Sequence, residues 1–376
     1  MKTIFSSVFS ILFKIFNILP KNKKKITFIL THDDRLNGNV KYLYEEIVSK
    51  YPDYKINIIT RNDYNKENIF NIFSLLKKII IIFFVKNYHL ATSKYIILNN
   101  IFITAAYFNF KKEVKVMQVW HAIGTFKKFG EDYEPSIKIN NLQKRANRIY
   151  TEVVVCSEKD RLIYSKAFNV DINKTKSLGS PICDLFQDDN KKQEIKQKIY
   201  NKYSKLKQKK IYLYAPTFRD TEEDNLKILS YVEQIGKSLD ENTILILRLH
   251  PHIYKKILYN KMIDNVIDMS NYDDVNELMI ISDVLITDYS SLFYEYSYLE
   301  KPIIFFAFDL KDYENKRGFY YNYIDYVPGE IIFTIEELIS RINQNSLVNK
   351  SKEFKEQYFD YRDGNSCERI VENLLK

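Results

Sequence analysis

The sequence has little of several features that define whole classes of protein. Its three cysteines lie far apart and form no CxxC pair, so neither a disulfide framework nor a cysteine zinc site is expected, and a reducing compartment fits. It has eight glycines and no Walker-type phosphate loop. It carries no RNA- or DNA-binding signature, so nucleic acid is not an expected partner.

What the chain does contain indicates a globular protein with an anionic partner. Hydrophobic residues make up 45% of its 376 residues and charged residues 28%, whereas a disordered chain lacks the apolar surface that offsets the entropy of ordering. The length suits two domains. Lysine and arginine outnumber aspartate and glutamate, for a net charge of +9, which favours an acidic membrane surface or a phosphorylated substrate.

The N-terminus is predicted to lie on a membrane surface. Residues 3–19 are mostly apolar, and on a helix the polar positions of this region form one narrow stripe: Ser6, Ser7, Ser10, Lys14, Asn17 and Lys21. Four lysines follow within residues 21–25, and an amphipathic helix beside basic residues can bind an anionic interface. We therefore predict a membrane-associating segment over residues 1–25, in a peripheral protein on the cytoplasmic side of the cell membrane.

Two other interpretations of the N-terminus stay open. The helix could pack on the protein's own core, or it could be a signal peptide, although no small-residue cleavage site follows it. A spanning helix is disfavoured by the short length of the apolar stretch and by Lys14 in its middle.

Strands and helices alternate through the rest of the chain. β-rich runs lie at residues 26–30, 55–60, 95–98, 114–119 and 152–156, and again at 211–214, 243–249, 266–269, 283–287 and 302–306. Strands with helices between them predict parallel sheets and an α/β fold. A polar, lysine-rich stretch at 188–210 separates the two series. We predict doubly wound domains at 26–188 and 189–350, followed by C-terminal helices at 351–376.

Reactive side chains follow several predicted strands, where ligands of doubly wound folds bind. After the strand at 283–287 a helix begins near Ser290 and Ser291, and its free N–H groups suit a phosphate. Glu295 follows about one turn later and would face the same mouth, where a carboxylate could accept hydrogen bonds from polyol hydroxyls. The alternatives are a simple serine cap and an ordinary surface glutamate.

Two of the five histidines, His121 and His250, end separate predicted strands. A neutral imidazole is the usual base for removing a proton from a hydroxyl near pH 7. A glycine and two lysines follow His121, and Arg248, which can pair with phosphate oxygens, precedes His250. A structural histidine is the alternative in each case. No metal site is predicted, because no HExxH motif and no DxD triplet ends a strand.

Five segments follow one another in a recognisable order: WHAIGTFKKFG, YAPTFRD, RLHP, SDVLITDYSSLFYEY and KPIIFFAFDLKDYENKRGFYYNY. This set resembles the CDP-glycerol glycerophosphotransferases of teichoic acid synthesis, and the end of the chain, DGNSCERIVENLL, resembles the end of that family. The resemblance covers roughly residues 20–376.

The resemblance implies a GT-B fold, with two Rossmann-like domains and an active site in the cleft between them. It implies that the C-terminal domain binds CDP-glycerol, that the acceptor is a saccharide linked to undecaprenyl diphosphate at the membrane, and that no cofactor takes part. His121 and His250 match the essential histidines of the family. The positions that match its CDP-glycerol contacts are His121, Ala122, Ile123, Gly124, Thr125, Pro216, Thr217, Arg248, Leu249, His250, Ser290, Ser291 and Glu295.

The resemblance also implies a mechanism and leaves some specificity open. An acceptor hydroxyl, deprotonated by His121, would attack the glycerol-bearing phosphorus, and CMP would leave. The short length resembles the primase type, which adds one glycerol phosphate. The family commonly has a basic residue where this chain has Ile182, so a CDP-ribitol transferase, a poly(glycerol phosphate) or capsule polymerase, and a GT-B nucleotide-sugar glycosyltransferase remain alternatives.

Overall fold

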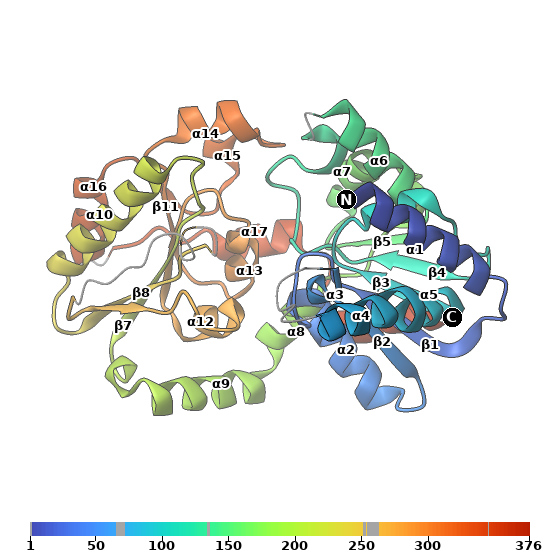
Figure 1. Cartoon of the computed structure of the whole chain (residues 1–376). Helices are drawn as coiled ribbons and strands as arrows, with labels where there is room; N and C mark the ends of the chain where they lie inside the picture. Colours follow the sequence, from blue (N-terminus) through green and yellow to red (C-terminus); the bar gives the residue numbers. More distant parts are fainter. Residues whose placement is uncertain (1, 65–71, 134–135, 251–252, 254–262, 345) are drawn as a thin grey trace. The chain divides into compact units, whose positions relative to one another are not determined.

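The computed structural model describes residues 2–64, 72–133, 136–250, 253, 263–344 and 346–376. The chain forms two compact units. The first comprises Met1–Asp184 and Asp360–Lys376, and the second comprises Leu185–Phe359. Each unit is built on one six-stranded, fully parallel sheet (Figure 1). The α/β fold expected from the alternation of strands and helices is therefore confirmed.

The sheet of the first unit has the strand order β2-β1-β3-β4-β5-β6. Its strands are β1 (Asn22–Ile29), β2 (Lys55–Ile59), β3 (Ser93–Leu98), β4 (Lys115–Gln118), β5 (Glu152–Val155) and β6 (Thr175–Ser177). Leu98 pairs with Gln118, so the residues that follow β3 and β4 leave the sheet side by side. β6 is a short edge strand that the sequence analysis missed, since Thr-Lys-Ser has no apolar run.

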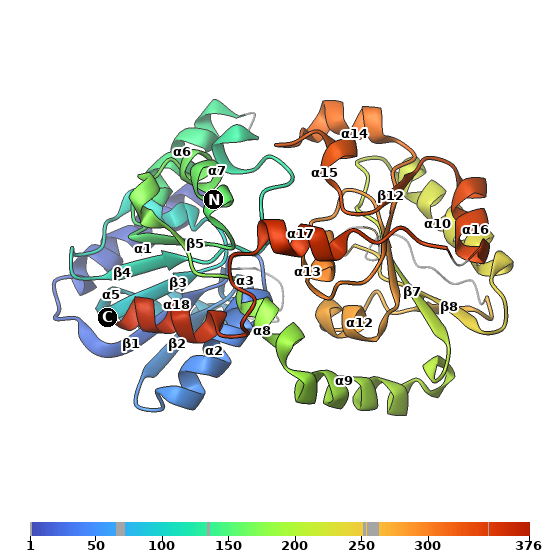
Figure 2. The ribbon, with the colours of Figure 1, turned by 180° about the vertical axis from the view of Figure 1, so that it is seen from behind.

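Helices cover both faces of this first sheet. One face carries α1 (Lys2–Phe16), α5 (Asn87–Thr92), α6 (Ile137–Asn147) and α7 (Glu158–Phe168), which supply buried apolar side chains to one core cluster. The other face carries α2 (Gly38–Lys50) and the last helix, α18 (Ser366–Leu375), which lie together (Figure 2). The remaining helical segments are α3 (Arg61–Tyr64), α4 (Ile72–Ile80), the π-helical η1 (Ile81–Lys86), η2 (Ile103–Tyr107), η3 (Gly130–Asp132), η4 (Ile172–Lys174) and α8 (Pro181–Gln187).

The sheet of the second unit has the order β12-β11-β10-β7-β8-β9. Its strands are β7 (Lys210–Ala215), β8 (Thr243–Leu247), β9 (Val266–Asp268), β10 (Val284–Thr287), β11 (Ile303–Phe306) and β12 (Glu330–Ile332). Its helical segments are α9 (Asp189–Lys202), η5 (Ser204–Leu206), α10 (Glu222–Ser238), α12 (Val275–Ile281), α13 (Leu292–Tyr298), α14 (Leu310–Arg317), α15 (Tyr323–Tyr326), α16 (Ile335–Gln344) and α17 (Ser351–Tyr358). α10 and α16 supply side chains to its main core cluster.

The C-terminal segment returns to the first unit after α17. Asp184 accepts hydrogen bonds from the backbone N–H groups of Ser366 (2.9 Å) and Cys367 (2.7 Å) at the start of α18. A carboxylate at a helix N-terminus satisfies donors that have no partner within the helix. The segment predicted as C-terminal helices thus contains two helices that belong to different units.

The N-terminal helix corrects the predicted polar stripe. Ser6 and Ser10 are buried together with Phe9 and Phe13, and Ser10 donates a hydrogen bond to the carbonyl of Ser6 (2.6 Å). Small hydroxyl residues can point inward when they bond to the backbone of their own helix. The helix therefore packs on the core of the protein, which was the alternative interpretation.

The four lysines of the predicted basic cluster lie in β1 or next to it and differ in burial, since Lys23 and Lys24 are exposed while Lys25 is buried. The Lys25 side chain is buried and donates a hydrogen bond to Thr92 (2.8 Å). Lys21 bonds to the backbone carbonyl of Ala91, and burial lowers its pKa to about 8. Lys24 pairs with Asp53 (3.0 Å). Among the described residues, no helix is long and apolar enough to cross a membrane.

Candidate active site

His121 stands at the carboxyl end of β4, in a segment that the preceding residues hold in an unusual conformation. Trp120 has a φ of 49°, a left-handed geometry that costs a non-glycine residue on the order of 1 kcal/mol or more. Its N–H donates to the side-chain oxygen of Gln118 (2.9 Å), and its ring packs against those of Phe129 and Phe168 at 5.3 and 5.0 Å. These contacts stabilise the turn that presents His121.

The imidazole of His121 is suited to act as a base. Its Nδ1 lies 3.4 Å from the backbone carbonyl oxygen of Asn99, which follows β3. This contact is a hydrogen bond when Nδ1 carries the proton, and Nε2 then keeps its lone pair. Desolvation by the surrounding protein lowers the pKa of His121. The side chain reaches the surface of the unit, and with a lowered pKa its ring is neutral at pH 7.

Helix α7 holds the residues that follow His121. The hydroxyl of Tyr164 lies 3.1 Å from the carbonyl oxygens of both Ala122 and Gly124. Gly124 has a φ of 68°, which a glycine adopts at little cost. The Ile123 side chain is buried. This stretch can therefore meet a ligand mainly through its backbone and through His121.

Thr125 is used inside the first unit. Its hydroxyl donates to Oδ1 of Asp160 (2.9 Å), and the hydroxyl of Ser157 donates to Oδ2 of the same carboxylate (2.9 Å). Asp160 is 2% exposed, and burial raises its pKa to about 6 despite these bonds. The sequence analysis did not single out Asn99, Asp160 or Tyr164. Of these three residues, only Asp160 is marked by a local sequence pattern, because the S-x-x-D spacing of Ser157 and Asp160 is typical of a helix start.

In the second unit, three adjacent strands bring the other predicted residues to one edge of the sheet. Tyr214 of β7 pairs with Leu247 of β8, and Ala215 of β7 pairs with Thr287 of β10. Parallel strands end at the same edge, so the residues after these three strands are neighbours. They are Pro216 and Thr217 after β7, Arg248, Leu249 and His250 after β8, and Ser290 and Ser291 after β10.

Asp288 organises this edge, and the sequence analysis missed it. One of its carboxylate oxygens accepts hydrogen bonds from the N–H and the hydroxyl of Thr217, both at 2.9 Å. Its other oxygen lies 2.9 Å from the guanidinium of Arg219, which also pairs with Asp309 through two hydrogen bonds of 2.6 and 2.9 Å. Arg219 is almost fully buried. The arginine of the YAPTFRD segment is therefore held by two carboxylates.

Arg248 and His250 differ in how they are held. The guanidinium of Arg248 donates to the carbonyl oxygens of Met269 (3.0 Å) and Ser270, and Leu249 is buried while its N–H donates to the hydroxyl of Ser270 (2.9 Å). Burial lowers the pKa of Arg248 from its very high ordinary value. The ring of His250 packs on that of Phe218 at 4.8 Å. The next residues, Pro251 and His252, lie outside the described part of the chain.

The serine pair precedes a short helix. Ser290 Oγ accepts a hydrogen bond from the N–H of Leu292 (3.3 Å), while Ser291 makes no side-chain capping bond. Glu295, on this helix, is 4% exposed, and its Oε2 has no hydrogen-bond partner within the described structure. Burial raises the pKa of Glu295 to about 8. Its carboxyl group is therefore mostly protonated at pH 7 and not the charged acceptor that was expected.

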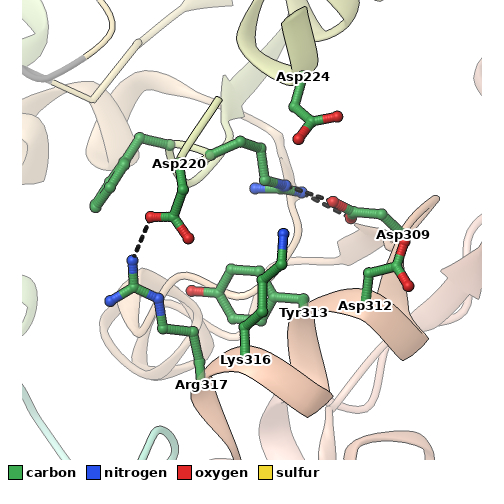
Figure 3. A pocket seen from close by; sticks show the side chains of 9 residues that line it. Asp220, Asp224, Asp309, Asp312, Tyr313, Lys316 and Arg317 are labelled. Carbon is green, nitrogen blue, oxygen red and sulfur yellow. Dashed lines mark hydrogen bonds and ion pairs between the residues drawn. The ribbon is translucent and has the colours of Figure 1, made fainter. Parts of the chain in front are cut away.

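A small charged pocket of about 50 Å3 lies beside Phe218 in the second unit. Lys316 extends into it from α14, between the Arg219–Asp309 pair and the pair formed by Asp220 and Arg317 (2.7 Å) (Figure 3).

In the first unit, Ile182 is buried on α8. Among the described residues, no group of three or more His, Cys, Asp or Glu side chains could hold a metal ion.

Comparison with known proteins agrees with this arrangement. The family model for CDP-glycerol:poly(glycerophosphate) glycerophosphotransferase matches residues 11–376. The teichoic acid glycerol-phosphate primase of Bacillus subtilis is 34% identical over 366 residues, which is 94% of this chain and 93% of the primase. The teichoic acid poly(ribitol-phosphate) polymerase of Bacillus spizizenii is 32% identical over 380 residues, 98% of this chain. The chain spans 59% of the length of that polymerase.

The fold is also similar to solved structures. A variant of the wall teichoic acid polymerase TagF superimposes with a TM-score of 0.80 at 23% identity, covering 96% of this chain and 92% of the other. The GT-B-like architecture of two parallel α/β units is thus shared. The extent of the family match, together with the similarity to the primase, identifies the chain as a member of the CDP-glycerol:poly(glycerophosphate) glycerophosphotransferase family of teichoic acid enzymes.

Proposed function

We propose that the protein transfers glycerol phosphate from CDP-glycerol to a hydroxyl group of a lipid-linked saccharide and releases CMP. The observation that carries this proposal is the exposed, neutral imidazole of His121 at a strand end, with Nδ1 beside the carbonyl oxygen of Asn99. Membership of the family makes a CDP-activated polyol the natural donor.

His121 would act as the general base. Its Nε2 accepts the proton of the attacking hydroxyl, the hydroxyl oxygen forms a bond to the glycerol-bearing phosphorus, and the bond from this phosphorus to the bridging oxygen breaks, so that CMP leaves with the electron pair. General-base catalysis of this kind is worth on the order of 10²–10⁴ in rate. Asn99 fixes the tautomer that the step requires.

Residues of the second unit would bind the donor. The imidazole of His250, the hydroxyls of Ser290 and Ser291, and the positive charge of Arg248 suit a diphosphate, because the leaving group gains negative charge as the bond breaks. The protonated carboxyl group of Glu295 can donate one hydrogen bond as well as accept others. We assign it to hydroxyl groups of the donor, where both capacities are used.

Ribitol phosphate is the second candidate for the transferred group. Among the relatives, the polymerase of Bacillus spizizenii and the TarK protein of Staphylococcus aureus, which is 32% identical over 378 residues, are ribitol-phosphate polymerases by name. The family's usual basic residue is replaced by the buried Ile182. This replacement removes a cation that could contact a phosphate or polyol. Position 182 therefore does not indicate whether the donor carries glycerol or ribitol.

We place the acceptor, a saccharide on undecaprenyl diphosphate, at the cytoplasmic side of the cell membrane. The net charge of +9 favours both an anionic lipid surface and an anionic donor. A single addition, as in the primase relative, and a polymerisation differ only in whether the product is used again as acceptor.

A donor panel tests the reaction. The protein is incubated with a short-chain lipid disaccharide and, in turn, CDP-glycerol, CDP-ribitol, a UDP-sugar and a GDP-sugar, and the product is read by mass spectrometry. The proposal expects CMP and a mass increase of one or more glycerol phosphates. Transfer of ribitol phosphate would select the second candidate, and a hexose increment would reveal a glycosyltransferase and overturn both.

A further inference from the structure

Three neighbouring strands of the first unit end at the edge of the sheet where His121 stands. β1, β3 and β4 follow one another in the strand order, and the carboxyl ends of parallel strands meet at one edge. His121 belongs to the segment after β4, Asn99 directly follows β3, and Asp33 lies in the segment after β1. The sequence analysis did not single out Asp33. The sheet brings these three residues together from separate parts of the chain.

Asn99 links the other two residues. Its side-chain amide donates a hydrogen bond to Oδ2 of Asp33 (2.8 Å), and its backbone carbonyl oxygen lies 3.4 Å from Nδ1 of His121. Asn99 is 4% exposed, and its side-chain oxygen accepts a hydrogen bond from Asn100 (3.2 Å), so both ends of this buried amide are paired. Because an ionised carboxylate can only accept, Asp33 determines which end of the amide faces it.

Gln118 fixes the same contact from the other side. Its side chain is fully buried. Its Oε1 accepts a hydrogen bond from the N–H of Trp120 (2.9 Å), and its Nε2 donates one to the carbonyl oxygen of Asn100 (3.2 Å). Because both partners are backbone groups of fixed type, the amide of Gln118 fits in one orientation only. This side chain therefore ties the turn that presents His121 to the loop that carries Asn99.

Asp33 is itself held in place. The N–H of Arg61, which follows β2, donates a hydrogen bond to the carbonyl oxygen of Asp33 (2.9 Å). The guanidinium of Arg61 pairs with the next residue, Asp34 (2.9 Å). A hydrogen bond to an ionised carboxylate is shorter and stronger than one between neutral groups. The hydrogen bond between Asp33 and Asn99 therefore restrains the loop after β3, including the carbonyl oxygen beside His121.

We propose that Asp33 is a positioning residue for the candidate base. By holding the side chain of Asn99, it keeps the carbonyl oxygen of Asn99 against Nδ1 of His121, so that Nδ1 carries the proton and Nε2 stays free. A base whose orientation is set by a third group recurs among enzymes. The use of this base in catalysis rests on the proposed function, whereas the tautomer of the ring does not. The alternative is a hydrogen bond that only ties two loops together.

The tautomer is measured on the full chain with nitrogen-15 in its histidines. Nuclear magnetic resonance distinguishes a protonated from an unprotonated ring nitrogen, and the signals missing from His121→Ala assign the ring. The wild type should show Nδ1 protonated and Nε2 unprotonated at neutral pH. Asp33→Ala should show a mixture of the two neutral tautomers, because the carbonyl group of Asn99 is no longer held. Asp33→Asn keeps an acceptor oxygen and should give the wild-type pattern.

Steady-state kinetics of the same proteins give a second readout. Asp33→Ala should lower kcat on the order of 10- to 100-fold, as loss of the carboxylate behind a metal-binding histidine typically does. The KM for the donor should stay within about twofold, since the donor is assigned to residues of the second unit. Asn99→Ala removes the same hydrogen bond from its other end, so it should give the same mixture of tautomers, and the double variant should lose no more than either single one. Asp34→Ala removes the neighbouring carboxylate, which pairs with Arg61, and is the matched control that should keep the wild-type tautomer and turnover.

Several results would overturn the role of Asp33. They are a wild type with Nε2 protonated, an unchanged tautomer in Asp33→Ala, an Asp34→Ala protein that loses as much turnover, and losses that add up in the double variant. Asn99→Ala keeps the test independent of whether Asp33→Ala folds. Failure of the proposed reaction looks different: if no CDP-activated donor yields CMP, the reaction is wrong, and the tautomers of the wild type and the variants still decide the role of Asp33.

Discussion

The hydroxyl of Tyr164 lies 3.1 Å from the carbonyl oxygen of Ala122 and 3.1 Å from that of Gly124. One side chain of α7 therefore holds both ends of the turn that follows His121. Asn39 of α2 approaches the same turn from the other direction and donates hydrogen bonds to the carbonyls of Val119 (3.4 Å) and Trp120 (3.3 Å). The position of the candidate base thus depends on two helices that contribute nothing else to the proposed chemistry.

Tyr164→Phe should lower kcat more than it raises KM for the donor. The substitution removes one hydroxyl, leaves two carbonyls without this donor and costs about 1 kcal/mol of stability, while the turn that presents His121 loosens. Steady-state kinetics with the donor and a soluble acceptor measure the effect. Tyr51→Phe, whose ring packs on Tyr54 at 5.9 Å before β2 begins, is the control. A purely structural tyrosine would lower stability and leave both kinetic parameters of the folded enzyme unchanged.

The free energy of unfolding of the first unit should depend on pH through Asp160. Its pKa is about 6 in the folded protein and near 3.9 in the unfolded chain. A raised carboxyl pKa gives stability that is fully present below the unfolded pKa and is lost as the pH rises through the folded pKa. Between pH 5 and pH 7.5 the wild type should lose about 1 kcal/mol from this group.

Asp160→Asn isolates this contribution because the amide does not titrate. Urea unfolding followed by the fluorescence of Trp120, the only tryptophan of the chain, reports on the unit that contains Asp160. Between pH 5 and pH 7.5, the free energy of unfolding of the wild type should fall by about 1 kcal/mol more than that of the variant. Parallel pH dependences in the two proteins would show that Asp160 keeps an ordinary pKa.

Sequence patterns predicted most of the strands but not how the candidate site is supported. β4 and β10 were found because short apolar runs are followed by polar residues at the strand end, as parallel strands require. β12 was missed because Glu-Ile-Ile is too short to show a pattern. Tyr164 and Asp160 stand some forty residues after the turn that they hold, and no local periodicity links a helix to a loop of another strand.

The N-terminal helix shows a different limit of sequence patterns. The apolar residues of α1 surround the helix, so hydrophobicity alone cannot say which side faces the core. The structure resolves this through size and shape. Phe13 stacks on Phe108 and Phe9 packs edge-on against Phe102 inside the unit, and the small Ser6 and Ser10 allow a close approach. Removal of this helix would therefore expose a core, not release an independent anchor.

His121→Ala and His250→Ala should each lower turnover by on the order of 10²–10⁴, with both proteins folded. For His121 the reason is loss of the base, and for His250 it is loss of charge stabilisation at the diphosphate. Because the base must be unprotonated and its pKa is lowered, the acidic limb of the wild-type kcat/KM profile should fall below the ordinary histidine value near 6.5.

His89→Ala is the control for the two active-site histidines. His89 lies 3.3 Å from the ammonium of Lys25, among residues that precede β3, and it should tolerate substitution within a few-fold in rate. If His121→Ala and His250→Ala matched this control in turnover, the roles assigned to both histidines would be wrong.

Glu295→Gln should leave activity near the wild-type level at pH 7, because the native carboxyl group is already mostly protonated there and an amide can also donate a hydrogen bond.

A difference in stability between the wild type and the Glu295→Gln variant should appear when the pH is raised. The folded pKa of about 8 lies far above the ordinary glutamate value, so this group stabilises the fold at low pH and that stabilisation is lost as the pH rises through 8. Hydrogen exchange of the α13 amides measures this local stability. It should decline by roughly 3 kcal/mol between pH 5 and pH 8 in the wild type. The variant should lack this decline, because its amide does not titrate. Glu223→Gln, at an exposed position of α10, should follow the wild type. A Glu295→Gln protein that declines as the wild type does, or that loses activity at pH 7, would mean that the carboxylate is charged in the working enzyme.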